Sequence, residues 1–96
     1  MYARVVRFTG ADAETLGQNL ARMRESSGPP EGVRSTALTV MADDANGTIV
    51  SIGFFETEED MRDGDEVLNS MTPPGGEMGT RVSVDLCEIK LELQAP

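Results

Sequence analysis

The chain has 96 residues, enough for one small domain, and 17 acidic against 8 basic side chains give it a net charge of −9. Such a charge repels phosphate backbones and anionic lipid, and no apolar run approaches the ~18 residues of a membrane span. Neither nucleic acid nor a membrane is therefore expected as a partner. Cys87 is the single cysteine and Met1 leads into a segment that arginines interrupt, so we expect a cytoplasmic protein without a disulfide or secretory signal.

The first half of the chain predicts a strand, a helix and a second strand. Residues Tyr2 to Phe8 are rich in valine and aromatic side chains, as is typical of strands. From about Asp12, the expected N-cap, to Glu25, apolar side chains recur at helical spacing at Leu16, Leu20 and Met23. Glycine and two prolines in residues 26–30 end that helix, and the next strand is expected from about Val33 to Met41.

The middle of the chain predicts a hairpin and a second helix. The acidic run from Asp43 to Gly47 ends in Asn-Gly, which favours a tight turn into a strand from Ile49 to Phe55. Thr57 followed by Asp60 resembles a capping box, and acidic residues next to it suit the positive end of a helix. The apolar stripe of that helix is expected to contain Met61, Gly64, Leu68 and Met71.

The last segment predicts an unusually long strand, from Thr80 to Leu93. Its apolar residues change sides partway, because Val82, Val84 and Leu86 share one side and Cys87, Ile89, Leu91 and Leu93 share the other. We therefore expect a bulge or bend near Leu86. The two halves would bury different faces, so the C-terminal half is expected to dock onto a second copy of the chain.

The order of these elements predicts an α+β fold. Strand, helix, strand, strand, helix, strand with right-handed crossovers gives a ferredoxin-like βαββαβ sandwich, a four-stranded antiparallel sheet with two helices. In the third strand Val50, Ile52 and Phe54 are expected to face the helices, yet Ile49 and Phe55 are also apolar. The second sheet face is therefore not built for water, and we expect a homodimer whose two sheets close into a barrel around a shared cavity.

The segment from Pro30 to Asp63 resembles the antibiotic biosynthesis monooxygenase-like (ABM) family of dimeric α+β barrels. The features that match are Gly32-Val33 before the second strand, the hairpin, and an aromatic-Glu-x-Glu-Glu passage from Phe55 to Glu59. The resemblance implies a homodimer without a metal or flavin cofactor. The family includes oxygenases of polyketide quinols, haem-degrading enzymes and members without an assigned reaction.

The sequence departs from the active members of that family at two positions. Phe55 stands where the family often has tryptophan, and Gly64 stands where it often has histidine. The chain contains no histidine, the usual haem ligand and the side chain best suited to proton transfer near neutral pH. Haem degradation in the manner of the family is therefore not expected.

Candidate ligand-binding residues lie on the first and third strands. If Phe54 faces the helices, the other side of its strand lines the cavity with Ile49, Ser51, Gly53 and Phe55, and the small pair leaves room for a flat apolar ligand beside the Phe55 ring. Gly53 can instead simply admit a bulky neighbour from another strand. Tyr2 and Arg4 share one side of the first strand and can orient a phenol or carboxylate, or they face solvent or pair with Asp85.

Other reactive side chains have structural interpretations. Cys87 lies near Asp85 and Glu88, so we expect a buried structural cysteine rather than a reactive thiolate. The acidic run of the second helix lacks histidine and the spacing of a calcium loop, so no metal site is expected there. The segment from Met71 to Gly79 is predicted to be a loop, either a plain connection or a lid over the cavity.

Two functions remain open on this sequence. The first is a non-catalytic homodimer that binds a small apolar or aromatic metabolite in a cavity between sheet and partner. The second is a cofactor-independent monooxygenase acting on an aromatic or quinol substrate, in which Phe55 stacks on the ring and Tyr2 or Arg4 holds its oxygen. Enclosed polar groups that converge on one point would favour catalysis, whereas an apolar cavity favours binding.

Overall fold

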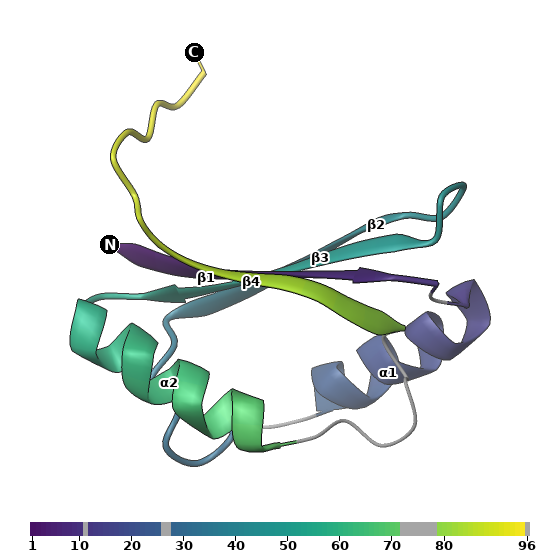
Figure 1. The fold of residues 1–96 in the computed structure, drawn as a ribbon, viewed down its shortest axis with the longest axis horizontal. Helices are drawn as coiled ribbons and strands as arrows, with labels where there is room; N and C mark the ends of the chain where they lie inside the picture. Colours follow the sequence, from purple (N-terminus) through teal and green to yellow (C-terminus); the bar gives the residue numbers. More distant parts are fainter. Residues whose placement is uncertain (11, 26–27, 72–78, 96) are drawn as a thin grey trace.

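The protein folds as a ferredoxin-like βαββαβ sandwich, as the order of elements predicts. The computed structural model describes residues 1–10, 12–25, 28–71 and 79–95. Its elements are β1 (Tyr2–Thr9), α1 (Ala13–Glu25), β2 (Ala37–Asp43), β3 (Thr48–Phe55), α2 (Glu58–Ser70) and β4 (Thr80–Glu88) (Figure 1). The strands form one antiparallel sheet in the order β2-β3-β1-β4. Neither described helix has the length and hydropathy that crossing a membrane requires.

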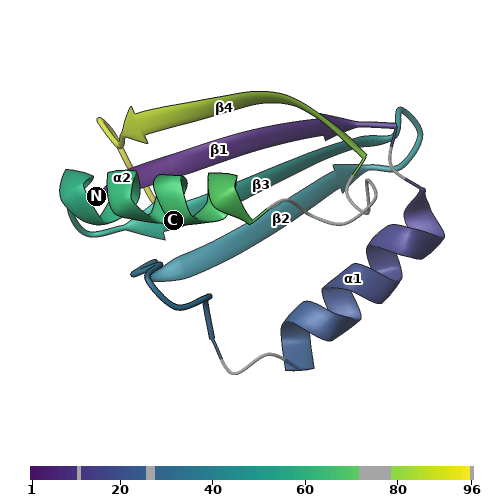
Figure 2. The same ribbon diagram turned by 60° about the horizontal axis from the view of Figure 1, so that its bottom comes forward.

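Both helices lie on one side of the sheet, and the other side faces away from them (Figure 1). Helix α2 packs on β1, β3 and β4, whereas α1 lies beyond the β2 edge (Figure 2). We call the two faces of the sheet the helix face and the open face. The last described residues rise from the end of β4 on the side of the open face (Figure 1).

The helices begin at the predicted caps. The Leu16 backbone N–H donates to the Asp12 carbonyl oxygen at 2.9 Å, so Asp12 accepts the first helical hydrogen bond of α1. At α2 the Asp60 backbone N–H donates to Thr57 Oγ1 at 3.0 Å, which satisfies one of the free donors of the first turn. The Asp60 carboxylate pairs with Arg34 at 3.4 Å and is thus used outside the capping box.

The core lies between α2 and the sheet. Phe55 from β3 is 1% exposed and packs with Met61 of α2 and with Val33, which precedes β2. Gly64 provides the space for the Phe55 ring, because a Cβ built on Gly64 would lie only 2.8 Å from the ring carbon Cε1. The glycine of α2 therefore serves a close approach between helix and aromatic side chain.

The expected orientation of β3 is wrong. Phe55 and Ile49 are each 1% exposed on the helix face, so the residues between them, Val50, Ile52 and Phe54, point to the open face. Both sets are apolar, and alternation alone therefore does not tell which one the helices cover. Gly64 decides the choice, since it leaves room beneath α2 for the ring of Phe55.

The second strand begins later than predicted, at Ala37. Val33 is apolar and β-branched, but its backbone N–H donates to the Pro30 carbonyl at 3.0 Å in a turn. Gly32 in this turn has a φ of +88°, a conformation that favours glycine, and a Cβ built on it would lie 3.1 Å from Val67 Cγ2 of α2. Val33 therefore lies in a turn, and its buried side chain packs against Phe55 and Met61 beneath α2.

The hairpin between β2 and β3 has the predicted turn. The Asn46 backbone N–H donates to the Asp43 carbonyl at 3.2 Å, and its side-chain amide donates to Asp43 Oδ2 at 2.7 Å. Gly47 follows with a φ of +63°, which returns the chain to the β3 strand.

The last strand is shorter than predicted and its bulge lies earlier. The register against β1 shifts between Arg7 and Phe8, which face Ser83 and Arg81, so Val82 is the extra residue. Strand β4 ends at Glu88, and residues 89–95 continue without a strand partner among the described residues. The extra residue at 82 places Val84 and Leu86 on the helix face and Cys87 on the open face.

The close approach of Gly64 to Phe55 predicts opposite effects of the same change in the two helices. We expect Gly64→Ala to lower the free energy of unfolding by about 1–3 kcal/mol, because the added methyl overlaps the Phe55 ring. Gly17→Ala in α1 is the matched control, since a Cβ there meets nothing within 4 Å. It should raise stability by about 0.5–1 kcal/mol. Urea unfolding of both variants measures the difference, and equal effects would contradict this account of Gly64.

Candidate functional site

The five candidate site residues share one face of two neighbouring strands. Tyr2 lies opposite Phe55 and Arg4 lies opposite Gly53 in the β1–β3 ladder, and Ser51 follows opposite Val6. Side chains of directly opposed residues point the same way, so all five belong to one surface. This surface is the helix face, whereas the sequence argument placed the cavity residues of β3 on the face away from the helices.

Arg4 is the most buried charged side chain of the described residues, with 9% of its surface exposed. Its Nε donates to Asp65 Oδ1 at 2.8 Å and its Nη2 donates to Asn69 Oδ1 at 3.1 Å, both on α2. Asp85, the partner considered from the sequence, lies opposite Val5 on the open face. Arg4 therefore joins α2 to β1 instead of pairing within the sheet.

A second guanidinium reaches the same acceptor. Arg81 at the start of β4 donates from Nη1 to Asn69 Oδ1 at 2.7 Å, so Asn69 bridges Arg4 and Arg81. Sequence reasoning missed this cluster, although Asp65 and Asn69 stand four residues apart and therefore on one side of a helix. Because its hydrogen bonds join three elements, the cluster fixes α2 over the end of the sheet.

Tyr2 is engaged at the other end of β1. Its hydroxyl donates to Glu88 Oε2 at 3.1 Å, and Lys90 also pairs with the Glu88 carboxylate. The hydrogen bond to Glu88 and the negative charge of that carboxylate raise the pKa of Tyr2 above its usual value. The hydrogen bonds from Lys90 and Tyr2 lower the pKa of Glu88, and the hydrogen bond to Glu88 raises the pKa of Lys90.

The aromatic candidate is covered by the core. Phe55 is 1% exposed, so its ring is fully occupied by packing in the subunit. A Cβ on Gly53 would lie 3.5 Å from Phe55 Cε2, an ordinary van der Waals distance, so the Phe55 ring does not require a glycine at this position. Ser51 is half-buried beside them and completes the small pair.

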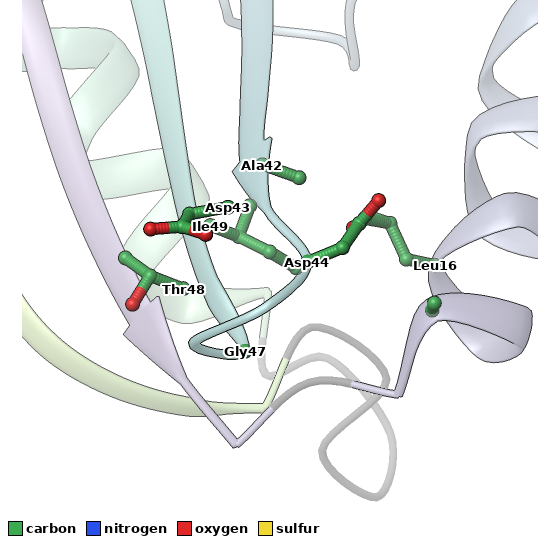
Figure 3. A pocket seen from close by; sticks show the side chains of 8 residues that line it. Leu16, Ala42, Asp43, Asp44, Gly47, Thr48 and Ile49 are labelled. Atoms are coloured by element: carbon green, nitrogen blue, oxygen red, sulfur yellow. The ribbon is translucent and has the colours of Figure 1, made fainter.

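A small hollow lies elsewhere on the helix face. It is formed where the start of α1 meets the turn between β2 and β3, and Figure 3 shows its lining side chains. The cavity volume is about 10 Å³, about the room for one water molecule. Leu16 and Ile49 supply its apolar part and Asp43 and Asp44 lie at its rim. None of the five candidate residues lines this hollow.

Three of the six acidic side chains of α2 pair with arginine. Glu58 accepts from Arg62 Nε at 3.0 Å, Asp60 pairs with Arg34, and Asp65 pairs with Arg4. In the described part of the chain, no three histidine, cysteine, aspartate or glutamate side chains gather as metal ligands would. The acidic run is therefore a charged helix surface.

Cys87 is exposed, and the expectation of a buried cysteine is wrong. It lies opposite Ala3 on the open face, near the edge of the sheet. The bulge at Val82 brings Cys87 to this face, because it adds one residue before the strand resumes its alternation. The loop proposed as a lid lies outside the described residues except at its ends, Met71 and Gly79.

The open face carries an apolar band across the two central strands. Val5 of β1 and Val50, Ile52 and Phe54 of β3 are half-buried there although no described helix covers them. Met41 of β2 extends the band and is 49% exposed. A contiguous apolar surface of this kind is typical of a site that contacts another protein or a ligand.

Comparisons of the chain with models of known protein families, with curated proteins and with solved structures found no match. A proposal about function therefore has to start from two surfaces of the structure itself. One is the helix face with the engaged side chains of Tyr2, Arg4 and Phe55. The other is the apolar open face.

Tyr2 is the single tyrosine of the chain and there is no tryptophan, so its titration can be followed by ultraviolet absorbance. We expect Glu88→Gln to shift the Tyr2 pKa downward toward the usual value for tyrosine, because the variant removes the carboxylate that accepts the hydrogen bond of the neutral hydroxyl and repels the phenolate. Glu92→Gln, which changes the charge equally in the same segment, is the control. An identical Tyr2 titration in the Glu88→Gln variant would refute the interaction.

Arg4 and Arg62 allow a comparison of a buried with an exposed ion pair. We expect Arg4→Met to lower the free energy of unfolding by about 3 kcal/mol, because Asp65 and Asn69 lose their charged donor beneath α2. Arg62→Met removes only the exposed pair with Glu58 and should cost about 0.5 kcal/mol or less. Chemical unfolding measures both, and similar losses in the two variants would contradict the structural role of Arg4.

Proposed function

We propose that the protein is a homodimer that binds a small apolar or aromatic molecule in a cavity between the open face and the partner subunit. The observation that supports this proposal is the apolar band of the open face. Its half-buried residues would remain in contact with water in an isolated subunit. Two such sheets facing each other would remove both bands from water and enclose a space between them.

A second copy of the chain is the partner we propose for the open face, because it presents the same apolar band. The net charge of −9 opposes self-association in general, but the band formed by β1 and β3 contains no acidic side chain. Asp85 lies at the edge of the open face, on β4, and Arg7 lies near the end of β1. Two copies related by a two-fold axis could therefore bury their centres without burying an unpaired carboxylate.

Phe54 is the aromatic side chain that this face offers to a ligand. It is half-buried at the end of β3, beside Ala3 and Ala37 in the two neighbouring strands. These alanines leave space around the ring, as a flat ligand would require. In the proposed dimer, Phe54 therefore has the stacking role that the sequence argument gave to Phe55.

Monooxygenase chemistry of the ABM kind remains the alternative proposal. In that proposal Phe55 stacks on the substrate ring and Tyr2 or Arg4 orients the substrate. In the structure Phe55 is packed in the core, Tyr2 bonds to Glu88, and Arg4 bonds to Asp65 of α2. Binding without catalysis is therefore the function we place first. Oxygen uptake above the buffer rate with a panel of electron-rich quinols would reverse this order. We also propose the reducing cytosol as the compartment, since Cys87 has no second cysteine with which to pair.

The homodimer can be tested with a charge on the open face. We expect the wild-type protein to be dimeric at micromolar concentration and Ile52→Glu to be monomeric, because the carboxylate would have to enter the apolar interface. Met71→Glu at the C-cap of α2 introduces the same charge at an apolar side chain that is 49% exposed and lies away from the open face, and it should leave the dimer intact. Native mass spectrometry reads the subunit number and any retained small molecule together. A monomeric wild-type protein would exclude the proposal.

Ligand binding is tested separately with Nile red, an uncharged apolar dye. We expect fluorescence enhancement with the dimeric wild-type protein and a loss of at least about tenfold in dye affinity for Phe54→Ala, which removes the ring that the ligand would contact. Phe8→Ala, on the helix face, is the matched control and should bind the dye as the wild type does. A dimer that does not bind the dye would support assembly while contradicting the ligand cavity.

A further inference from the structure

Strand β2 is an unprotected edge of the sheet. Six of its seven residues are exposed, and from Ala37 to Ala42 it contains neither a charge nor a proline. Leu38 and Met41 are 51% and 49% exposed on its two faces. A long, uncharged, apolar edge strand readily pairs with another strand, and proteins normally block such edges with charges, bulges or a covering element.

The opposite edge, β4, has those protections. It carries Arg81, Asp85 and Glu88, and the bulge at Val82 interrupts its ladder with β1. The two edges therefore differ in how well they resist pairing with another strand. Strand β4 is built against further pairing, whereas β2 leaves its outer row of backbone N–H and C=O groups open to a partner strand.

Residues 89–95 have the side-chain alternation of a strand, but they belong to no strand in the described part of the chain. Ile89, Leu91 and Leu93 alternate with Lys90, Glu92 and Gln94. Leu91 is 74% exposed and Leu93 is 82% exposed, an unusual state for two leucines at strand spacing. The Ile89 backbone N–H donates to the Met1 carbonyl at 3.0 Å, so the segment starts from a fixed point beside β1.

The segment does not fit the β2 edge of its own subunit. Strands β1 and β3 separate β4 from β2, so it would have to cross three inter-strand spacings, about 14 Å. Seven extended residues reach only about 23 Å, which would leave too little chain to pair along β2. The segment instead leaves on the side of the open face, where the proposed partner subunit would lie (Figure 1).

We propose that residues 89–95 of one subunit add to the β2 edge of the other subunit as a fifth strand. This inference rests on the proposed homodimer and names the surface through which each subunit holds its partner. The seven residues of the segment match the seven residues of β2 in length. Backbone hydrogen bonds would then satisfy the open row of β2, as in other cases of strand addition.

The apolar side of the added strand would lie on the helix face, where Leu38 of β2 and Met23 of α1 are exposed. The dimer through the open face leaves these two side chains uncovered, so that interface does not account for them. Leu91 and Leu93 would cover them, while Lys90 and Glu92 point to the opposite side. Strand addition therefore accounts for four exposed apolar residues that belong to three separate parts of the chain.

Hydrogen–deuterium exchange of the full-length protein tests this interface. We expect backbone amides in residues 90–94 to exchange roughly tenfold or more slowly than in an unstructured peptide of the same sequence. Leu38→Lys should remove this protection, because a lysine on an edge strand opposes pairing. Val82→Lys places the same charge on the protected edge at a residue that is 57% exposed, and should leave the protection unchanged.

Leu91→Asp provides an independent variant, because the changed side chain lies outside the subunit core and cannot unfold it. It should remove the protection as Leu38→Lys does. A dimeric wild-type protein with unprotected residues 90–94, or protection that survives both variants, would overturn the strand addition while leaving the homodimer in place. A monomeric wild-type protein would overturn both proposals.

Discussion

The packing of the Phe55 ring against Gly64 determines the positions of the other elements. The ring occupies the space that a side chain on α2 would otherwise fill, and Met61 and Val33 close the cluster around it. Because residues alternate along β3, burying Phe55 also sets Gly53, Ser51 and Ile49 on the helix face. The same alternation directs Phe54 and its neighbours outward. One close contact thus decides which apolar set forms the core and which forms the open face.

The polar cluster of Arg4, Asp65, Asn69 and Arg81 complements this contact. The Phe55 cluster holds the first part of α2, and the hydrogen bonds from Arg4 hold its second half against β1. A buried guanidinium of this kind is satisfied only in one arrangement of helix and sheet. In helix α1 the buried residues are Leu16 and Asn19, and Met23 is exposed.

The sequence allowed the order of elements, both helix caps and the hairpin turn to be predicted, because each depends on a few neighbouring residues. The orientation of β3 could not be predicted, since Val50, Ile52 and Phe54 are as apolar as Ile49 and Phe55. The surroundings of the candidate site were missed because Arg4 finds its partners 61 and 65 positions away. Likewise, the bulge at Val82 becomes visible only when β4 is paired with β1, and it changes the environment of Cys87.

The central position of β1 has a consequence for biosynthesis. This strand is translated before the other three, yet its two neighbours are β3 and β4, and Tyr2 reaches Glu88 across 86 positions of sequence. The sheet is therefore complete only after β4 has left the ribosome. Such distant pairing makes folding slow compared with that of helical proteins of similar length. Until then, the valines of β1 lack their native partners. Residues 1–55 carry six acidic and five basic side chains, so nearly all of the negative charge that keeps chains apart is added with α2 and the segment that follows it.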